Sequence, residues 1–188
     1  MSTVPVLALT SLSVVNLLLT LVVLARLSAM RRAAFVTGGE AGAVPGPLGR
    51  DPAPPPAGTE PANFAAATVD GGTVSAYGLS GVMLAGFFAT DCSSCKELIP
   101  RFMDYAEAMP GGRGQVLAVI AGDPDVAAKL AVLLDTVARV VVEPHQGPVA
   151  QAFGVLDFPV VCLLDGRRVM ASAFDVNRLP APAPRTPS

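Results

Sequence analysis

The chain has 188 residues, with 13 basic and 15 acidic side chains, one histidine and three cysteines. The net charge of −2 provides no basic face for phosphate contacts, so nucleic-acid binding is disfavoured. One histidine and three unevenly spaced cysteines also argue against a multi-histidine metal site and a small disulfide-stapled fold. Mean hydropathy is high, at +0.54, yet the chain contains 18 glycines and 18 prolines. We therefore expect a membrane segment and a stretch that cannot form packed core.

Near its start the chain has an uncharged, mostly apolar run from Val4 to Ala25. As a helix this run would be about 33 Å long, enough to cross a hydrocarbon core about 30 Å thick. A cleavable signal peptide is the alternative, but it needs a basic start, which MSTVP lacks, and a shorter apolar core. We expect residues 1–32 to be a retained, single-pass anchor in contact with the lipid bilayer.

Composition then changes abruptly. Residues 33–61 are rich in proline and glycine and carry almost no large apolar side chains. Such a segment cannot bury enough surface to offset its ordering entropy, so we predict a disordered linker. Residues 180–188 predict a disordered tail by the same argument. Residues 62–179 remain as one domain of ordinary size.

Apolar patterning predicts alternating strands and helices in this domain. Residues 82–89 (VMLAGFFA) form a continuous apolar run, which is typical of a central strand buried on both faces. Asp165-Gly166 suits a tight hairpin turn with paired positive φ angles, and Asp123 or Asp125 would cap a helix. The order ββ, βαβα, βαββ predicts an α/β domain with a mixed central sheet and helices on both faces. The expected strands are 65–69, 73–75, 82–89, 115–121, 139–142, 160–164 and 167–172, and the expected helices are 93–109, 125–136 and 148–153.

The motif Cys92-Ser93-Ser94-Cys95 stands where the central strand ends and a helix begins. A thiolate there faces unpaired backbone N–H groups and the positive end of the helix dipole, which lower a thiol pKa. The spacing puts both sulfurs on the first turn, with the first exposed and the second partly shielded. This asymmetry suits disulfide exchange, in which Cys92 attacks a partner and Cys95 resolves the mixed disulfide. The Cys92–Cys95 pair would itself be the redox group, with no bound cofactor or metal.

Two other interpretations of the motif remain open: a static disulfide and one arm of a zinc site. A zinc site needs four ligands, for which the chain offers only Cys92, Cys95, Cys162 and His145. Cys162 lies inside a predicted buried strand, which favours its interpretation as a small core side chain. His145 lies in the predicted turn EPHQGP, which favours its interpretation as a solvated loop residue.

A second element is Phe158-Pro159, which opens the strand VVCLL. Given this topology, Pro159 would lie opposite the two cysteines. A cis bond before it would leave the Phe158 backbone free to pair with a substrate strand and would exclude a metal from the dithiol. We therefore predict Phe158 and Pro159 as substrate-binding residues, although a mere edge proline is the simpler alternative.

The chain resembles the membrane-anchored, thioredoxin-like thiol–disulfide oxidoreductases of the TlpA, ResA and MauD kind. The resemblance covers about residues 62–172 and also the layout of anchor and linker. It implies a thioredoxin-like fold and an enzyme that exchanges disulfides with protein substrates, together with an upstream electron donor or acceptor. The matching segments are Asn63-Phe64, VDGGTVSAYGLSG, FFATDCSSCKELIP with Pro100, and FGVLDFPVVCLLDGRRV.

Three departures from this family stand out. Asp91 replaces the usual aromatic residue before the first cysteine, and its carboxylate opposes thiolate formation, which Lys96 could offset. Gly86 stands where thioredoxins place a buried acid, so no obvious base remains for Cys95. The C-terminal helix that normally covers the sheet is nearly absent, because prolines begin at Pro180.

Two other functions share this fold. One is a non-catalytic binding module or copper chaperone, in which Cys92, Cys95 and His145 would be the copper ligands. A peroxiredoxin-type peroxidase would need a proline and a threonine where the chain has Ala85 and Ala89, so it is the weaker of the two.

Two observations disagree on which side of the membrane carries the domain. Arg26, Arg31 and Arg32 follow the apolar run with no basic side chain before it, which favours a cytoplasmic domain. The family resemblance and the stability of disulfides outside the reducing cytosol favour the other side. We expect an extracytoplasmic domain, because such tethered domains serve exported substrates.

Overall fold

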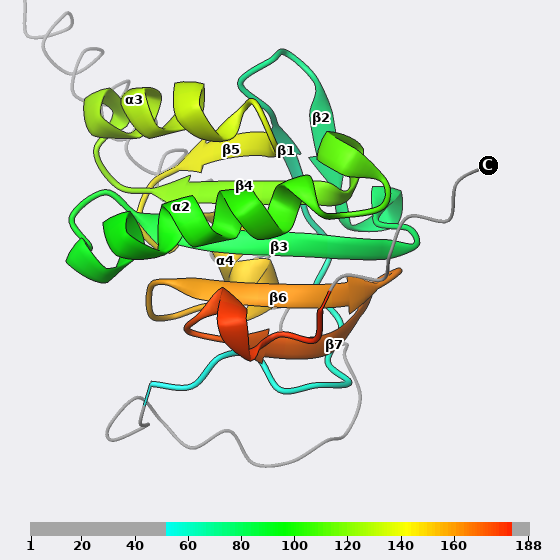
Figure 1. The fold of residues 1–188 in the computed structure, drawn as a ribbon. Coiled ribbons are helices and arrows are strands. Elements are labelled where there is room, and N and C mark those ends of the chain that lie inside the picture. Colours follow the sequence, from blue (N-terminus) through cyan, green and yellow to red (C-terminus); the bar gives the residue numbers. More distant parts are fainter. Residues whose placement is uncertain (1–51, 182–188) are drawn as a thin grey trace, which may run out of the picture. The chain divides into compact units, whose positions relative to one another are not determined.

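The computed structural model describes residues 52–181. The predicted anchor, most of the predicted linker and residues 182–188 lie outside this range. A five-stranded mixed sheet forms the centre, and a two-stranded hairpin lies beside it (Figure 1). The elements are β1 (Ala65–Ala67), β2 (Thr73–Ser75), β3 (Val82–Ala89), α2 (Ser93–Glu107), β4 (Val116–Ala121), α3 (Pro124–Leu134), β5 (Arg139–Glu143), α4 (Pro148–Phe153), β6 (Val160–Asp165) and β7 (Arg168–Ala173), with 3-10 turns η1 (Ala76–Gly78), η2 (Gly112–Gln115) and η3 (Val176–Arg178).

The strand order in the main sheet is β5-β4-β3-β6-β7. β3, β4 and β5 are parallel, whereas β6 is antiparallel to both β3 and β7. The C-terminal ends of β3, β4, β5 and β7 therefore meet the N-terminal end of β6 at one edge of the sheet. We call this the redox edge, because the cysteine motif follows β3 there. The element order predicted from the sequence is confirmed, with element ends shifted by one or two residues.

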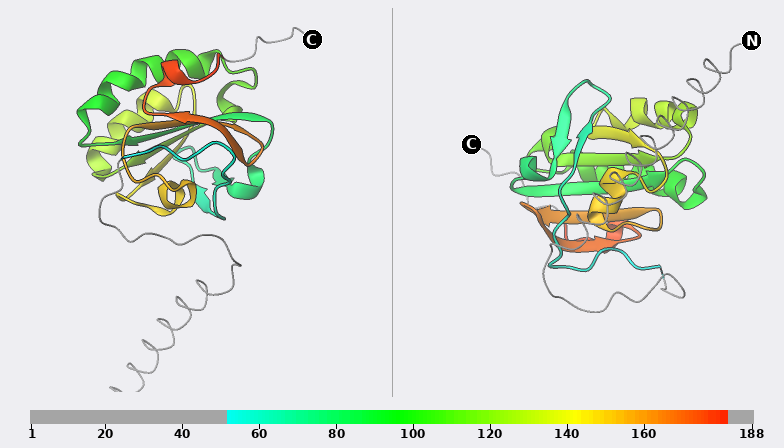
Figure 2. Two further views of the ribbon diagram at one scale, coloured as in Figure 1. Left: turned by 90° about the horizontal axis from the view of Figure 1, so that it is seen from below. Right: turned by 180° about the vertical axis from the view of Figure 1, so that it is seen from behind.

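Two apolar cores cover the two faces of the sheet. α2, α3 and η3 contribute to the core on one face, and α4 with the β1–β2 hairpin contributes to the core on the other; the layers are visible in Figures 1 and 2. All six residues of β4 and all but the first of β3 are buried. This explains why both strands are continuous apolar runs and not alternating ones.

Part of the predicted linker, residues 55–59, pairs with strand β7. The backbone N–H of Gly58 donates to the carbonyl of Val169 at 2.7 Å, and Val169 N–H donates back to Thr59 at 2.9 Å. Ser172 Oγ also donates to the Pro55 carbonyl. This segment runs along the outer strand β7 (Figure 2) and covers its free edge. Composition could not indicate this, because the pairing uses backbone groups that any non-proline residue supplies.

Within residues 52–181, the element that follows β7 is the 3-10 turn η3. η3 and Leu179 pack against the α2 core, and Tyr105 Oη donates to the Pro180 carbonyl. The turn between β6 and β7 differs from the prediction: Asp165 pairs with Arg168, so Gly166 and Arg167 form the loop. Only Gly166 has positive φ there, at 56°, because Arg167 has a Cβ that disfavours that conformation.

No helix within residues 52–181 is both long and apolar enough to cross a bilayer. The predicted span at residues 4–25 lies outside the described residues.

Gly86 lies in the middle of β3, paired with Ala118 on one side and Val161 on the other. A Cβ at this position would lie 2.5 Å from Cε2 of Phe102 and 2.9 Å from Cε2 of Phe88. Both rings are fully buried and pack edge to face, with centroids 5.1 Å apart. Glycine is therefore required here for packing, because aromatic rings fill the space that a side chain would need.

This packing predicts that Gly86→Ala lowers the free energy of unfolding by about 1–3 kcal/mol, the usual cost of overfilling a core. Gly114→Ala is the matched control, since a Cβ there meets no atom within 4 Å, and its effect should stay within about 0.5 kcal/mol. Urea denaturation of both variants measures the difference. Equal stability of the two variants would contradict this account of Gly86.

Candidate functional site

Cys92 and Cys95 lie at the start of α2, where it leaves the redox edge. Cys92 is the N-cap residue, with extended backbone, and its Sγ accepts a hydrogen bond of 3.1 Å from the backbone N–H of Cys95. The two residues form a disulfide, with their Cα atoms 5.3 Å apart. A capping sulfur at this position faces the unpaired N–H groups of the first turn, which favour negative charge.

The two sulfurs differ in exposure. Cys92 is half-buried, whereas Cys95 is 1% exposed and belongs to the core under α2. The backbone N–H of Ala89, the last residue of β3, points at Cys95 Sγ from 3.4 Å. An approaching disulfide or thiol can therefore reach Cys92 first, and Cys95 only through Cys92. This is the geometry that the predicted roles of nucleophile and resolving thiol require.

Phe158 lies beside Cys92, and Pro159 follows it directly before strand β6. The Phe158–Pro159 peptide bond is cis, and the carbonyl oxygen of Phe158 lies 3.6 Å from Cys92 Sγ. Phe158 is half-buried and Pro159 is buried. The structure thus brings the four predicted site residues together, and their functional roles stay predictions.

Cys95 lies in an apolar core cluster. Phe102 fills the space beside Gly86 and shares its apolar core with Cys95. Within residues 52–181, the only buried carboxylate is that of Glu143. Its two oxygens accept hydrogen bonds of 2.9 Å from the backbone N–H groups of Val149 and Ala150. That carboxylate therefore serves as the acceptor for N–H groups at the start of α4.

His145, which the sequence analysis favoured as a solvated loop residue and kept as an alternative metal ligand, lies beside the site. Its Nε2 lies 3.5 Å from Oδ1 of Asp91, and its ring centroid lies 6.3 Å from that of Phe158 in an edge-to-face arrangement. The available signal was positional: His145 follows β5, and parallel strands place the residues after their C-terminal ends at one edge. The turn composition alone gave no such indication.

The described residues do not form a ligand set for either the zinc site or the copper site considered above. Within residues 52–181, no group of three or more His, Cys, Asp or Glu side chains is placed to hold a metal ion. His145 faces Asp91, and Cys162 is fully buried in β6, paired with Ala85 of β3.

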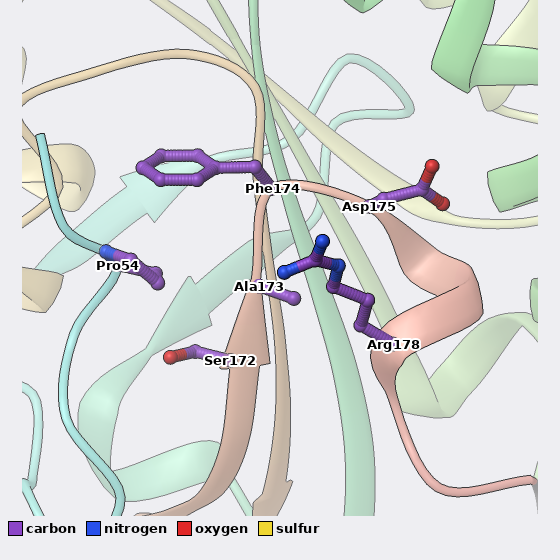
Figure 3. A pocket seen from close by; sticks show the side chains of 6 residues that line it. All are labelled: Pro54, Ser172, Ala173, Phe174, Asp175 and Arg178. Atoms are coloured by element: carbon purple, nitrogen blue, oxygen red, sulfur yellow. The ribbon is translucent and has the colours of Figure 1, made fainter.

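A separate cavity of about 490 Å³ opens beyond the end of β7 (Figure 3). In this view the Arg178 side chain reaches back toward Ala173, whereas the Asp175 carboxylate points away from it. Asp175 pairs with Arg101 at 2.7 Å, and a backbone hydrogen bond from Asn177 together with this arginine lowers its pKa. The cavity shares no residue with the dithiol site. Its lining residues are Pro54, Ser172, Ala173, Phe174, Asp175 and Arg178.

Burial raises the pKa of the Cys162 thiol to about 12, so this thiol stays protonated and unreactive across the physiological range. We predict that iodoacetamide modifies no more than Cys92 and Cys95 in the reduced, folded protein up to about pH 9. Mass spectrometry of native and denatured samples tests this, with Cys162 modified only after denaturation. Modification of Cys162 in the folded protein would contradict its placement.

Comparison with known proteins gives a match at the level of the fold. No model of a known protein family matches the chain, and no curated protein matches it. Among solved structures, the thioredoxin domain of a thiol-disulfide oxidoreductase from Bacteroides vulgatus superposes with a TM-score of 0.53 at 18% sequence identity. The match covers 65% of this chain and 91% of that one.

Two further structures agree. A thiol:disulfide interchange protein from a Bacteroides species has a TM-score of 0.50 at 18% identity, covering 62% of this chain and 80% of that one. A hypothetical protein from Sinorhizobium meliloti has a TM-score of 0.51 at 19% identity, covering 67% and 77%. The described part of the chain therefore has the thioredoxin-like α/β fold, and it places a Cys-x-x-Cys pair at the start of the first long helix after the central strand.

Proposed function

We propose that this protein is a thiol–disulfide oxidoreductase that exchanges disulfides with protein substrates through Cys92 and Cys95. The observation that supports this most directly is the difference between the two linked sulfurs: Cys92 is half-buried at the helix start, and Cys95 is sealed beneath it. The solved structures named as a thiol-disulfide oxidoreductase and a thiol:disulfide interchange protein share the fold and support the same proposal.

In the reducing direction, the Cys92 thiolate attacks one sulfur of a substrate disulfide. A mixed disulfide forms, and the other substrate sulfur leaves as a thiolate. The Cys95 thiolate then attacks Cys92 Sγ, which closes the Cys92–Cys95 disulfide and releases the second substrate thiolate. Two electrons pass to the substrate. The same steps in reverse oxidise a substrate dithiol, and a second dithiol or disulfide protein restores the starting state.

Local contacts support both halves of this cycle. The Cys95 N–H that caps Cys92 Sγ is placed to stabilise a Cys92 thiolate. The Ala89 N–H directed at Cys95 Sγ can stabilise the Cys95 thiolate. The Phe158 carbonyl beside Cys92 offers an acceptor for the backbone N–H of a substrate strand that presents its sulfur to Cys92.

Trapping tests this proposal. Cys95→Ser should accumulate covalent adducts with client proteins through Cys92, because the step that releases the mixed disulfide is removed. Non-reducing electrophoresis and mass spectrometry of cells that express the full chain detect these adducts. The doubly substituted Cys92→Ser, Cys95→Ser protein is the control and should form none. Adducts equal in amount with both proteins, or absent from both, would reject disulfide exchange as the function.

The proposal also includes tethering to the cell membrane by residues 1–32, with the domain on the extracytoplasmic side. It rests on the apolar run and on the redox chemistry, since a Cys92–Cys95 disulfide persists where the surroundings are not reducing. Residues 33–51 stand in the sequence between the predicted anchor and the described domain.

Labelling of intact cells tests this topology. After treatment with a membrane-impermeant reductant, a membrane-impermeant maleimide should modify Cys92 without cell lysis. The Cys92→Ser, Cys95→Ser protein should remain unlabelled, because Cys162 is buried. Labelling that appears only after lysis would place the domain in the cytoplasm.

A further inference from the structure

His145 lies at the redox edge, beside two neighbours of Cys92. Its Nε2 is 3.5 Å from the carboxylate of Asp91, the residue directly before Cys92. Its ring packs edge to face with Phe158, whose carbonyl oxygen lies 3.6 Å from Cys92 Sγ. The imidazole therefore lies next to Asp91, which precedes Cys92, and next to Phe158, whose carbonyl oxygen faces Cys92 Sγ.

The fold fixes this histidine in place. The Glu143 carboxylate holds the start of α4 through two backbone hydrogen bonds, and a Cβ at Gly147 would collide with that carboxylate. Gln151 Nε2 donates to the Gln146 carbonyl and closes the loop. These contacts hold the loop between β5 and α4 on both sides of His145.

A neighbouring glycine leaves room for the imidazole. Gly122, after β4, has φ +123°, and a Cβ there would lie 2.9 Å from His145 Nε2 and would collide with Thr90 Oγ1. Thr90 Oγ1 in turn accepts a hydrogen bond of 3.0 Å from Asp123 N–H. The loops after β3 and β4 are therefore packed together around the space that His145 occupies.

Acidic groups predominate around the imidazole. Asp91 faces it directly with a side chain that is 75% exposed. Asp123 caps α3 through hydrogen bonds to the N–H groups of Asp125 and Val126, and Glu143 caps α4. Asp157 precedes Phe158 and Lys96 lies on the first turn of α2, and both residues are exposed. A carboxylate next to Cys92 disfavours its thiolate, and Nε2 of His145 lies 3.5 Å from that carboxylate.

We propose that His145 is a positioning residue of the dithiol site, whose protonated imidazole neutralises Asp91 and thereby favours the Cys92 thiolate. This inference rests on the proposed function, because it concerns the reactivity of the same sulfur. Histidine changes charge near neutral pH. Its support for the thiolate is therefore present in acid and is lost as the imidazole deprotonates.

The rate of alkylation of Cys92 as a function of pH tests this inference. Full-length protein with Cys95→Ser isolates Cys92, and iodoacetamide reacts in proportion to the thiolate fraction. Adding His145→Gln should slow alkylation about two- to fivefold below pH 7, the range expected for an exposed charge pair. The two rates should converge as the pH rises above the range in which histidine side chains carry a charge, and the difference should shrink in high salt.

Two controls separate a charge effect from a structural one. Arg168→Gln removes one positive charge at the opposite end of the sheet and should leave the profile unchanged. In an Asp91→Asn background, His145→Gln should have a smaller effect, since the imidazole loses the carboxylate that favours its charged form. A difference that is independent of pH, or no difference at all, would overturn the inference.

This alkylation assay uses no client protein, so its result can be obtained whether or not the protein exchanges disulfides with clients. Normal trapping of clients with an unchanged alkylation profile in His145→Gln would reject the role of His145 alone. A changed profile without any trapped client would reject the proposed function alone.

Discussion

The capping of α2 by a sulfur is the interaction on which the proposed chemistry depends. Cys92 occupies the position where a helix needs an acceptor for its first N–H groups, and its Sγ receives the N–H of Cys95. The same spacing brings the two sulfurs within bonding distance on one turn. One local structure thus presents an accessible sulfur, places its partner beneath it and favours negative charge at both.

The rest of the domain fixes that turn in place. β3 is buried on both faces between β4 and β6, and it ends directly before the motif. Aromatic packing of Phe88 and Phe102 fills the space beside Gly86. Backbone N–H groups contact both sulfurs, and Asp91 and His145 lie together at the redox edge.

Much of this could be predicted from the sequence, for identifiable reasons. β3 matches its predicted range because a strand buried on both faces is a continuous apolar run. The start of α2 follows from the Cys-x-x-Cys motif, and Asp123 is confirmed as the cap of α3, since its carboxylate accepts two backbone N–H groups. Other features depend on contacts between distant segments. Gly58 and Thr59 pair with β7, and His145 lies close to Asp91. Neither contact leaves a local pattern in the sequence. Composition alone therefore predicts a linker for the first segment and a solvated loop position for His145.

A redox titration of the purified full-length protein tests the central claim most directly. The protein is equilibrated with dithiol–disulfide buffers of graded potential, and the alkylated state of each cysteine is measured by mass spectrometry. The account predicts one reversible two-electron transition in which Cys92 and Cys95 change together and Cys162 does not take part. A pair that no dithiol couple can reduce and reoxidise, or a transition that involves Cys162, would contradict it.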